Sequence, residues 1–145
     1  LMFPIHNESG KVIAFGGRAL RSDEEPKYLN SPETAIYKKS HTLYNLHRAK
    51  ESIRKSDRVV LVEGYMDVIG VYAAGVRQVV ASCGTALTEE QVRSMKRHST
   101  HVVINFDPDN AGANGAERTT QKLLAEGMQI RVLELEGGPV AGALH

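Results

Sequence analysis

Acidic side chains gather at two points of the sequence, each directly after a short apolar run. Glu63 and Asp67 follow the first run, and Asp107 and Asp109 follow the second. Carboxylates held close together repel one another, and Mg²⁺ relieves that repulsion because it takes oxygen ligands. The bound ion can also neutralise charge that builds on a phosphoryl group. Together the two motifs favour a metal site for phosphoryl transfer, although helix capping or an Asp-Pro-Asp turn explains either motif alone.

The apolar runs before these acids belong to an alternating pattern of strands and helices. We expect strands at 58–62, 77–81, 101–106 and 129–135, with helices at 65–74, 88–98 and 113–126 between them. Strand–helix repetition with short connections predicts an α/β fold, a parallel sheet with helices on both faces. The carboxyl ends of parallel strands form the crevice where ligands bind. We therefore expect Glu63 to meet Asp107 and Asp109 at one edge of the sheet.

The segment before this sheet has a different pattern and predicts a small separate lobe. Residues 2–5 and 12–15, around a turn at 7–10, predict a β-hairpin. The polar, proline-punctuated stretch 21–32 predicts a loop, and 43–55 predicts an amphipathic linking helix. Lys and Arg are frequent between 18 and 55, and a basic stripe can follow a phosphate backbone. By themselves, however, these charges favour the simpler interpretation of solvated faces.

Composition narrows the class of protein. The chain has 145 residues, 41% of them hydrophobic, which is enough for a single core, and a net charge of +1. No apolar run approaches the ~20 residues that cross a bilayer, so we expect a cytoplasmic protein without membrane association. The one cysteine, Cys83, excludes an internal disulfide framework and a cysteine-cluster zinc site. We expect Cys83 to be a small buried residue rather than a nucleophile.

Several of these segments resemble a known family. Glu-Gly-Tyr-Met-Asp-Val at 63–68 and Asp-Pro-Asp-Asn-Ala-Gly at 107–112 resemble the acidic motifs of the TOPRIM domain, which primases, topoisomerases and some nucleases share. Phe-Pro-Ile at 3–5, Gly-Gly-Arg at 16–18 and Lys-Tyr-Leu-Asn-Ser-Pro-Glu-Thr at 27–34 resemble the DnaG-type bacterial primase core. The resemblance implies a partial amino-terminal lobe over 1–56, a TOPRIM metal-binding domain over 57–138 and a tail over 139–145.

The resemblance also implies roles for individual residues. Glu63, Asp107 and Asp109 match the catalytic acids that bind Mg²⁺, or Mn²⁺ as a substitute, and Asp67 lies beside them. In the family, Glu63 would serve the metal site and handle a proton near the reacting phosphate. Positions that line the groove for single-stranded template are matched by Arg18, Lys27, Asn30 and Lys39, with Lys38 an alternative to Lys39.

The implied activity is template-directed synthesis of short RNA primers on single-stranded DNA. A primer 3′-hydroxyl would attack the α-phosphate of a ribonucleoside triphosphate, and pyrophosphate would leave. The partners would be the template, ribonucleoside triphosphates and the RNA–DNA hybrid product. A replicative helicase would bind through a domain that this sequence lacks, as it lacks the family's zinc module.

The sequence departs from the family pattern at one point, and two alternatives stay open. Family members carry a further acidic motif after the last strand, whereas no acid follows Glu134 and Glu136 here. A nucleic-acid-binding module that is catalytically silent is therefore one alternative. Another TOPRIM enzyme, which cleaves or rejoins DNA, is the second, although no tyrosine has the features of a topoisomerase nucleophile.

Overall fold

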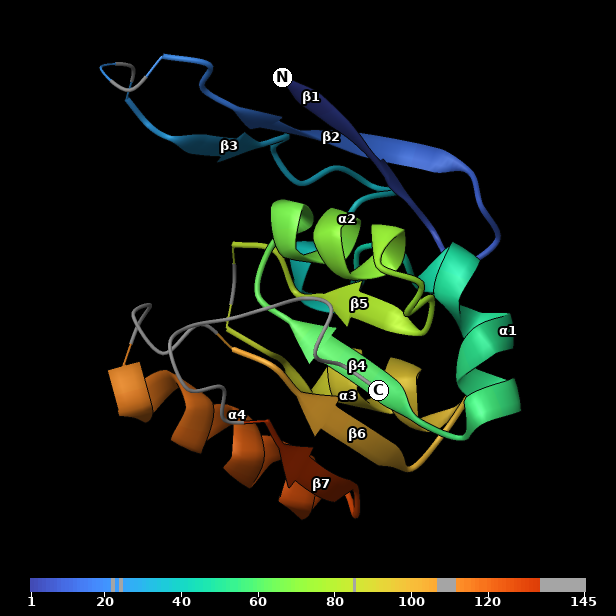
Figure 1. Cartoon of the computed structure of the whole chain (residues 1–145). Coiled ribbons are helices and arrows are strands. Elements are labelled where there is room, and N and C mark those ends of the chain that lie inside the picture. The colour runs from blue at the N-terminus through green and yellow to red at the C-terminus, as the bar shows by residue number, and fades with distance from the viewer. Residues whose placement is uncertain (22, 24, 85, 107–111, 134–145) are drawn as a thin grey trace.

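The computed structural model describes the chain apart from residues 22, 24, 85, 107–111 and 134–145. It contains an antiparallel sheet near the N-terminus and a parallel sheet that carries most of the helices (Figure 1). In chain order the elements are β1 (Met2–His6), β2 (Val12–Arg18), β3 (Tyr28–Asn30), a 3₁₀ turn η1 (Lys39–His41), α1 (Leu46–Ser56), β4 (Val59–Val62), α2 (Tyr65–Ala73), β5 (Val79–Ala81), α3 (Glu89–Lys96), β6 (His101–Ile104), α4 (Gly112–Ala125) and β7 (Gln129–Val132).

The parallel sheet has the strand order β5-β4-β6-β7, which confirms the predicted α/β fold. Its central strand β4 is buried along its whole length, as its unbroken run of valine and leucine predicts. Val62 lies opposite Ala81 of β5, and Leu61 lies opposite Ile104 of β6. The carboxyl ends of β4, β5 and β6 therefore lie at one edge of the sheet.

Helices cover both faces of this sheet, as predicted. Val60 and Val62 point into a core that includes α2 and the antiparallel sheet. The alternate residues Val59 and Leu61 point into a second core that includes α1, α3 and α4. The period of two along a strand accounts for this division. Within the described part of the chain, no helix has the length and apolar character to span a bilayer.

The antiparallel sheet confirms the predicted hairpin and adds a strand to it. β1 pairs with β2, and β3 joins the other side of β2, with Gly16 opposite Asn30 and Arg18 opposite Tyr28. The prediction of a loop over 21–32 is therefore wrong at Tyr28–Asn30. A strand of three residues has too little local pattern to be recognised, because its hydrogen bonds come from a distant partner.

The linking helix begins later than predicted, at Leu46. Tyr44 first pairs with Ala81, donating its N–H to the Ala81 carbonyl at 2.8 Å, so the chain is extended there. Buried Asn45 then adopts φ 73° and donates its side-chain amide to the carbonyl of Val79 at 3.1 Å. This segment fastens the N-terminal lobe to β5 before α1 starts.

Candidate active site

Glu63 directly follows the central strand β4 and is half-buried at the carboxyl edge of the sheet. Gly64 then leads into α2, and the Gly64 N–H donates to Oδ2 of Asp67 at 3.1 Å. The Asp67 carboxylate thus caps the first turn of α2, where negative charge is favourable. This capping orders the backbone immediately after Glu63. Asp67 is exposed, and its predicted role as a metal ligand stays a prediction.

Asp107 and Asp109 lie outside the described residues, as do Glu134 and Glu136. The structure does describe the strand that leads to Asp107. β6 ends at Ile104 beside Leu61, and the Asn105 N–H donates to the Leu61 carbonyl at 3.0 Å. The chain therefore leaves β6 at the same edge as Glu63. The described residues contain no group of three His, Cys, Asp or Glu side chains arranged to hold a metal ion.

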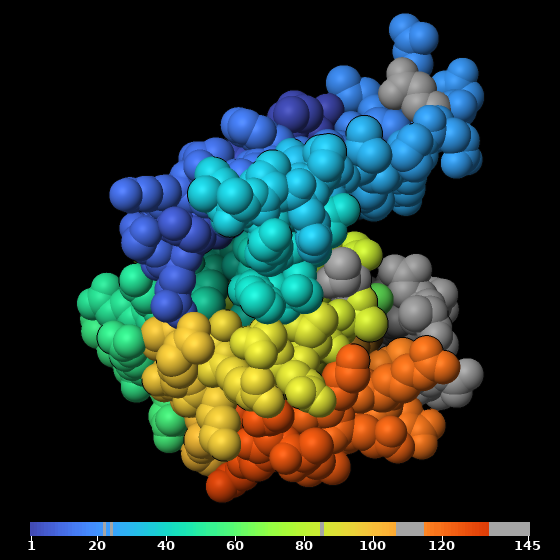
Figure 2. Space-filling model, turned by 180° about the vertical axis from the view of Figure 1, so that it is seen from behind, coloured from blue at the N-terminus to red at the C-terminus, as the bar shows by residue number. Residues whose placement is uncertain are grey.

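Two of the predicted template-binding residues, Arg18 and Lys27, come together around one tyrosine. The Arg18 guanidinium lies 5.8 Å from the centre of the Tyr28 ring, and the Lys27 ammonium lies 5.9 Å from it. The segment between them, residues 18–28, is called the β2–β3 arm here, and Figure 2 shows it in lighter blue, projecting beyond the rest of the molecule. Between Arg18 and Lys27 the arm also carries Arg21 and the exposed acids Asp23 and Glu25.

Sequence reasoning did not single out Tyr28, although an aromatic residue among basic ones is a typical signal of single-strand binding. Tyr28 is 43% exposed, so part of its surface is open to a partner. The Arg18 Nε is buried and has no hydrogen-bond partner within the described residues. Two cations and an exposed ring offer contacts to a phosphate and to a base.

Asn30 faces the same side of β3 as Tyr28, but its side chain binds within the protein. Tyr65 donates its hydroxyl to Oδ1 of Asn30, and Nδ2 of Asn30 donates to the Cys83 carbonyl at 3.4 Å. Tyr65 follows Glu63 by two residues, and Cys83 follows β5 by two. The structure therefore places Asn30 between the arm and the carboxyl edge of the parallel sheet.

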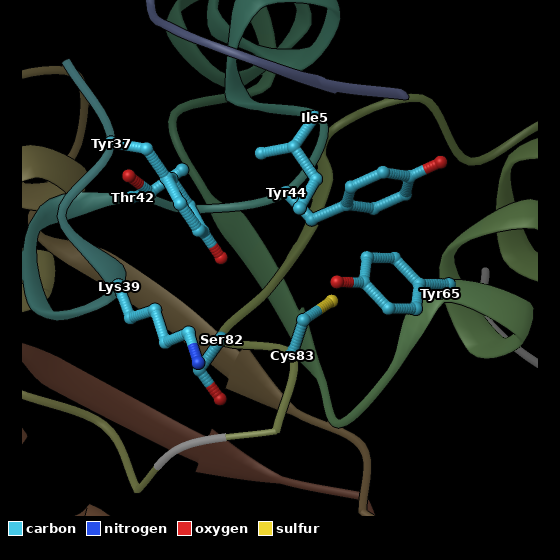
Figure 3. A pocket seen from close by; sticks show the side chains of 8 residues that line it. All are labelled: Ile5, Tyr37, Lys39, Thr42, Tyr44, Tyr65, Ser82 and Cys83. Atoms are coloured by element: carbon cyan, nitrogen blue, oxygen red, sulfur yellow. The ribbon is translucent and has the colours of Figure 1, made fainter. Parts of the chain in front are cut away.

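Lys39 lies on η1, apart from the Arg18–Lys27 pair, and lines a pocket with Tyr65, Ser82 and Cys83 (Figure 3). Lys38 is exposed, whereas Lys39 is half-buried. The pocket has a volume of about 10 Å³, room for about one water molecule. It is therefore better described as a gap in the interface between the N-terminal lobe and the parallel-sheet domain, called the seam here, than as a nucleotide pocket.

The groups on the pocket wall beside Lys39 are held in their neutral forms. Burial raises the pKa of the Cys83 thiol, and the charge of Asp67 raises it further. Burial likewise raises the pKa of the Tyr65 phenol. Cys83 is 9% exposed, which confirms the prediction of a small buried residue. A thiol kept protonated in this way is a poor nucleophile.

Comparison with known proteins identifies both parts of the chain. Residues 1–50 match the family described as the DNA primase catalytic core, N-terminal domain, and residues 57–134 match the Toprim domain. A DNA primase of Synechococcus elongatus is 50% identical over 144 residues, which cover 95% of this chain and 21% of that protein. The chain thus spans about a fifth of this curated relative.

Solved structures give the same result. The primase of Aquifex aeolicus, with its zinc-binding and RNA polymerase domains, has a TM-score of 0.90 and 37% identity over 97% of this chain and 35% of that one. A DnaG primase catalytic domain solved bound to single-stranded DNA has a TM-score of 0.84 and 38% identity, covering 99% of this chain and 46% of that one. These relatives are named as primases and not as Toprim enzymes that cleave DNA. The chain belongs to the family of DnaG-type primase catalytic cores, and it carries the Toprim domain of that core.

Proposed function

We propose that this chain supplies the acidic edge and part of the template surface of a DNA primase. The proposed enzyme joins ribonucleotides on single-stranded DNA in the order that the template dictates. The observation that carries the proposal is the position of Asn30. Its side chain hydrogen-bonds to Tyr65, three residues after β4, and to Cys83, two residues after β5. Arg18 and Tyr28 lie one step further along the strands, on the same face of the sheet. That step is two residues, or about 7 Å along a strand.

Phosphate contacts from Arg18 and Lys27 would hold the template without reference to its sequence. Stacking of a base on Tyr28 would add affinity that every base can provide. Lys39, at the other end of the seam, is proposed as a further template contact. The DnaG relative solved with single-stranded DNA supports this assignment. Ribonucleoside triphosphates, the RNA–DNA product and a helicase that docks on another domain complete the proposed partners, in the cytoplasm.

Glu63, Asp107 and Asp109, with Asp67 beside them, are proposed to bind Mg²⁺, for which Mn²⁺ can substitute. The described donors fit this choice, since Glu63 and Asp67 offer oxygen ligands, which hard divalent cations prefer. When bound, Mg²⁺ would orient the attacking oxygen and neutralise charge on the reacting phosphate. Glu63, held by the capped turn at Gly64, would keep that site at the edge of the sheet and accept the proton of the primer 3′-hydroxyl.

The attacking 3′-hydroxyl would displace pyrophosphate from the α-phosphate of the incoming nucleotide. The contribution of the protein is then largely positioning and electrostatics. In this proposal residues 1–56 form part of the template-binding lobe, 57–138 form the Toprim domain and 139–145 form a tail.

The test is primer synthesis by a chimera in which this chain replaces the aligned stretch of the Synechococcus elongatus primase. Glu63→Gln, and Asp107→Asn with Asp109→Asn, should each lower the rate with Mg²⁺ by at least about 100-fold, because several kcal/mol of charge stabilisation would be lost. Glu117→Gln, on the exposed surface of α4, is the matched control and should keep the parental rate. Parental synthesis by both acidic-site variants would refute the proposal.

A further inference from the structure

The side chain of Tyr65 joins the two lobes. It belongs to the first turn of α2, but its ring is 3% exposed and packs within the N-terminal lobe. It stacks on Phe3 of β1 with ring centres 5.0 Å apart and an interplanar angle of 9°. It also meets Tyr44 edge-on at 4.7 Å. A ring packed on two sides in this way has a well-defined direction, so its hydroxyl is aimed rather than free to rotate away.

The hydroxyl of Tyr65 and the amide of Asn30 form a chain of hydrogen bonds across the seam. Tyr65 donates to Asn30, and Asn30 donates to the carbonyl of Cys83. Cys83 has φ 47°, a left-handed conformation that directs its carbonyl toward β3. One side chain on β3 is thus tied to the residues that follow both β4 and β5. Figure 3 shows the Tyr65 phenol directed toward Cys83.

Close van der Waals packing accompanies these hydrogen bonds. Gly16 lies opposite Asn30 in the β2–β3 pairing. A Cβ atom at Gly16 would lie 2.6 Å from both Cζ and the hydroxyl oxygen of Tyr65, so only a glycine lets β2 approach this closely. Gly16, Asn30, Tyr65 and Cys83 are called the junction here. Because it combines hydrogen bonds with close packing, the junction fixes how far the β2–β3 sheet stands from the carboxyl edge.

The junction lies between the two groups that the proposed reaction must bring together. Glu63 precedes Tyr65 by two residues, and Arg18 and Tyr28 lie two residues beyond Gly16 and Asn30 on the same strands. Any loosening at the junction therefore changes the distance between the template contacts and the acids. A misplacement of ~1 Å can cost about 100-fold in rate.

We infer that Tyr65 and Asn30 are positioning residues, which set the distance between the Arg18–Lys27 template contacts and Glu63, and that Asn30 acts through Tyr65 rather than by touching the template. This inference rests on the proposed primase function. It replaces the expectation that Asn30 binds nucleic acid directly, because both ends of its amide are used within the protein.

A double-mutant cycle in the chimera tests the inference. Tyr65→Phe removes the hydroxyl and keeps the ring, and Asn30→Ala removes its acceptor. Each should lower kcat about 10-fold or more at saturating template, while the Kd for single-stranded DNA stays within about twofold. The double variant should be no worse than Asn30→Ala alone, because Asn30→Ala already removes the hydrogen bond that Tyr65→Phe removes. Tyr44→Phe, which touches the same ring from β5's side of the seam, is the control and should keep the parental kcat.

Two results would overturn the inference. One is a kcat for Tyr65→Phe within about twofold of the parent. The other is a raised Kd for Asn30→Ala with effects that add to those of Tyr65→Phe, which would show that Asn30 contacts the template itself.

A measurement that needs no activity separates failure of this inference from failure of the proposed function. Spin labels at Leu20→Cys on the arm and Gln121→Cys on α4 report the distance between the lobes in this chain; both positions are exposed. Tyr65→Phe should broaden or shift that distance distribution, and Tyr44→Phe should not. A changed distribution in an inactive parent would support the junction and refute the primase proposal. An unchanged distribution would refute the junction whatever the activity.

Discussion

At the scale of single residues, Tyr28 positions the two cations of the proposed template surface. The Arg18 guanidinium lies 5.8 Å and the Lys27 ammonium 5.9 Å from the centre of its ring, and an aromatic face attracts a cation without help from an acid. Among the described residues, neither cation forms an ion pair with an acid. The exposed acids Asp23 and Glu25 lie further along the arm. The cations placed against Tyr28 are thus Arg18 and Lys27, whereas Arg21 lies further along the arm.

Removing either cation should weaken binding of single-stranded DNA by a salt-dependent amount. Each phosphate contact contributes about 0.7 to the slope of log K against log salt, so Arg18→Ala and Lys27→Ala should each make the slope shallower by about that amount. Fluorescence anisotropy of a labelled oligothymidine, titrated at several salt concentrations, measures this. Lys11→Ala, an exposed lysine in the β1–β2 turn, should leave the slope unchanged. If all the variants had the slope of the parent, the assignment of Arg18 and Lys27 to the template surface would be wrong.

At the scale of elements, the two adjacent glycines of β2 differ in the space that a larger side chain would have. Successive residues of a strand face opposite sides, so Gly16 points toward Tyr65 whereas Gly17 points away from it. A Cβ atom at Gly17 would find its nearest neighbour, the Leu29 carbonyl oxygen, at an ordinary 3.5 Å. The close approach of β2 to α2 thus depends on one position of the Gly-Gly-Arg segment and not on its neighbour.

Substituting alanine at each glycine should therefore give opposite results. Gly16→Ala should lower the free energy of unfolding by about 1–3 kcal/mol, because Tyr65 is packed between two rings and cannot yield. Gly17→Ala should be neutral or stabilising by up to about 1 kcal/mol, since alanine suits a strand better than glycine. Urea denaturation of both variants measures the difference. A Gly16→Ala variant as stable as the parent would mean that the strand can move away from α2 at little cost.

At the scale of the whole molecule, the far end of the hairpin is also fastened to the parallel-sheet domain. Glu8 in the β1–β2 turn accepts from His98 at 2.9 Å, lies 3.8 Å from Arg97, and receives the Lys50 ammonium on its carbonyl at 2.9 Å. Burial alone would raise the pKa of Glu8, but the hydrogen bond from His98 and the nearby positive charges lower it overall. This contact attaches the lobe at a point separate from the junction, which restricts its rotation.

The second histidine contact of this region should make stability depend on pH. His6 and His47 stack with ring centres 4.1 Å apart, and burial, with the charges of His6, Arg48 and Lys50, lowers the pKa of His47 to about 4. Between that value and the ordinary pKa of 6.5, the unfolded chain binds more protons than the folded one. The free energy of unfolding should therefore fall as pH decreases through this window. Below it, protonation of Glu8 should remove further stability.

Chemical denaturation at a series of pH values tests this dependence. His47→Gln should make the curve shallower between pH 6.5 and about 4, because His47 is gone, although burial also lowers the pKa of His6 and keeps part of the slope. His41→Gln, an exposed histidine on η1, should leave the curve unchanged. A parental stability that stays constant across the window would contradict the assignment to His47.

The sequence by itself determined the parallel sheet, its helices and the first acid of the site, because those features depend on local pattern. The runs of β-branched residues predicted strands. The helix expected over 88–98 opens with a local capping box, in which the backbone N–H of Thr88 and that of Gln91 each donate to the other's side chain. Glu63 was predicted at the end of a buried strand and lies there. Its metal partners Asp107 and Asp109 stay a prediction.

Only the tertiary structure decided the features that depend on distant partners. β3 exists because β2 supplies its hydrogen bonds, and α1 starts late because Tyr44 pairs with Ala81 of β5. The segment around Asn30 predicted a template contact for it. In the structure, however, its side chain is hydrogen-bonded to Tyr65, 35 residues away in the sequence, and to Cys83, 53 residues away. A local pattern records the preferences of a residue and not its neighbours in space. Contacts between segments far apart in the chain become known only when the packing that brings them together is known.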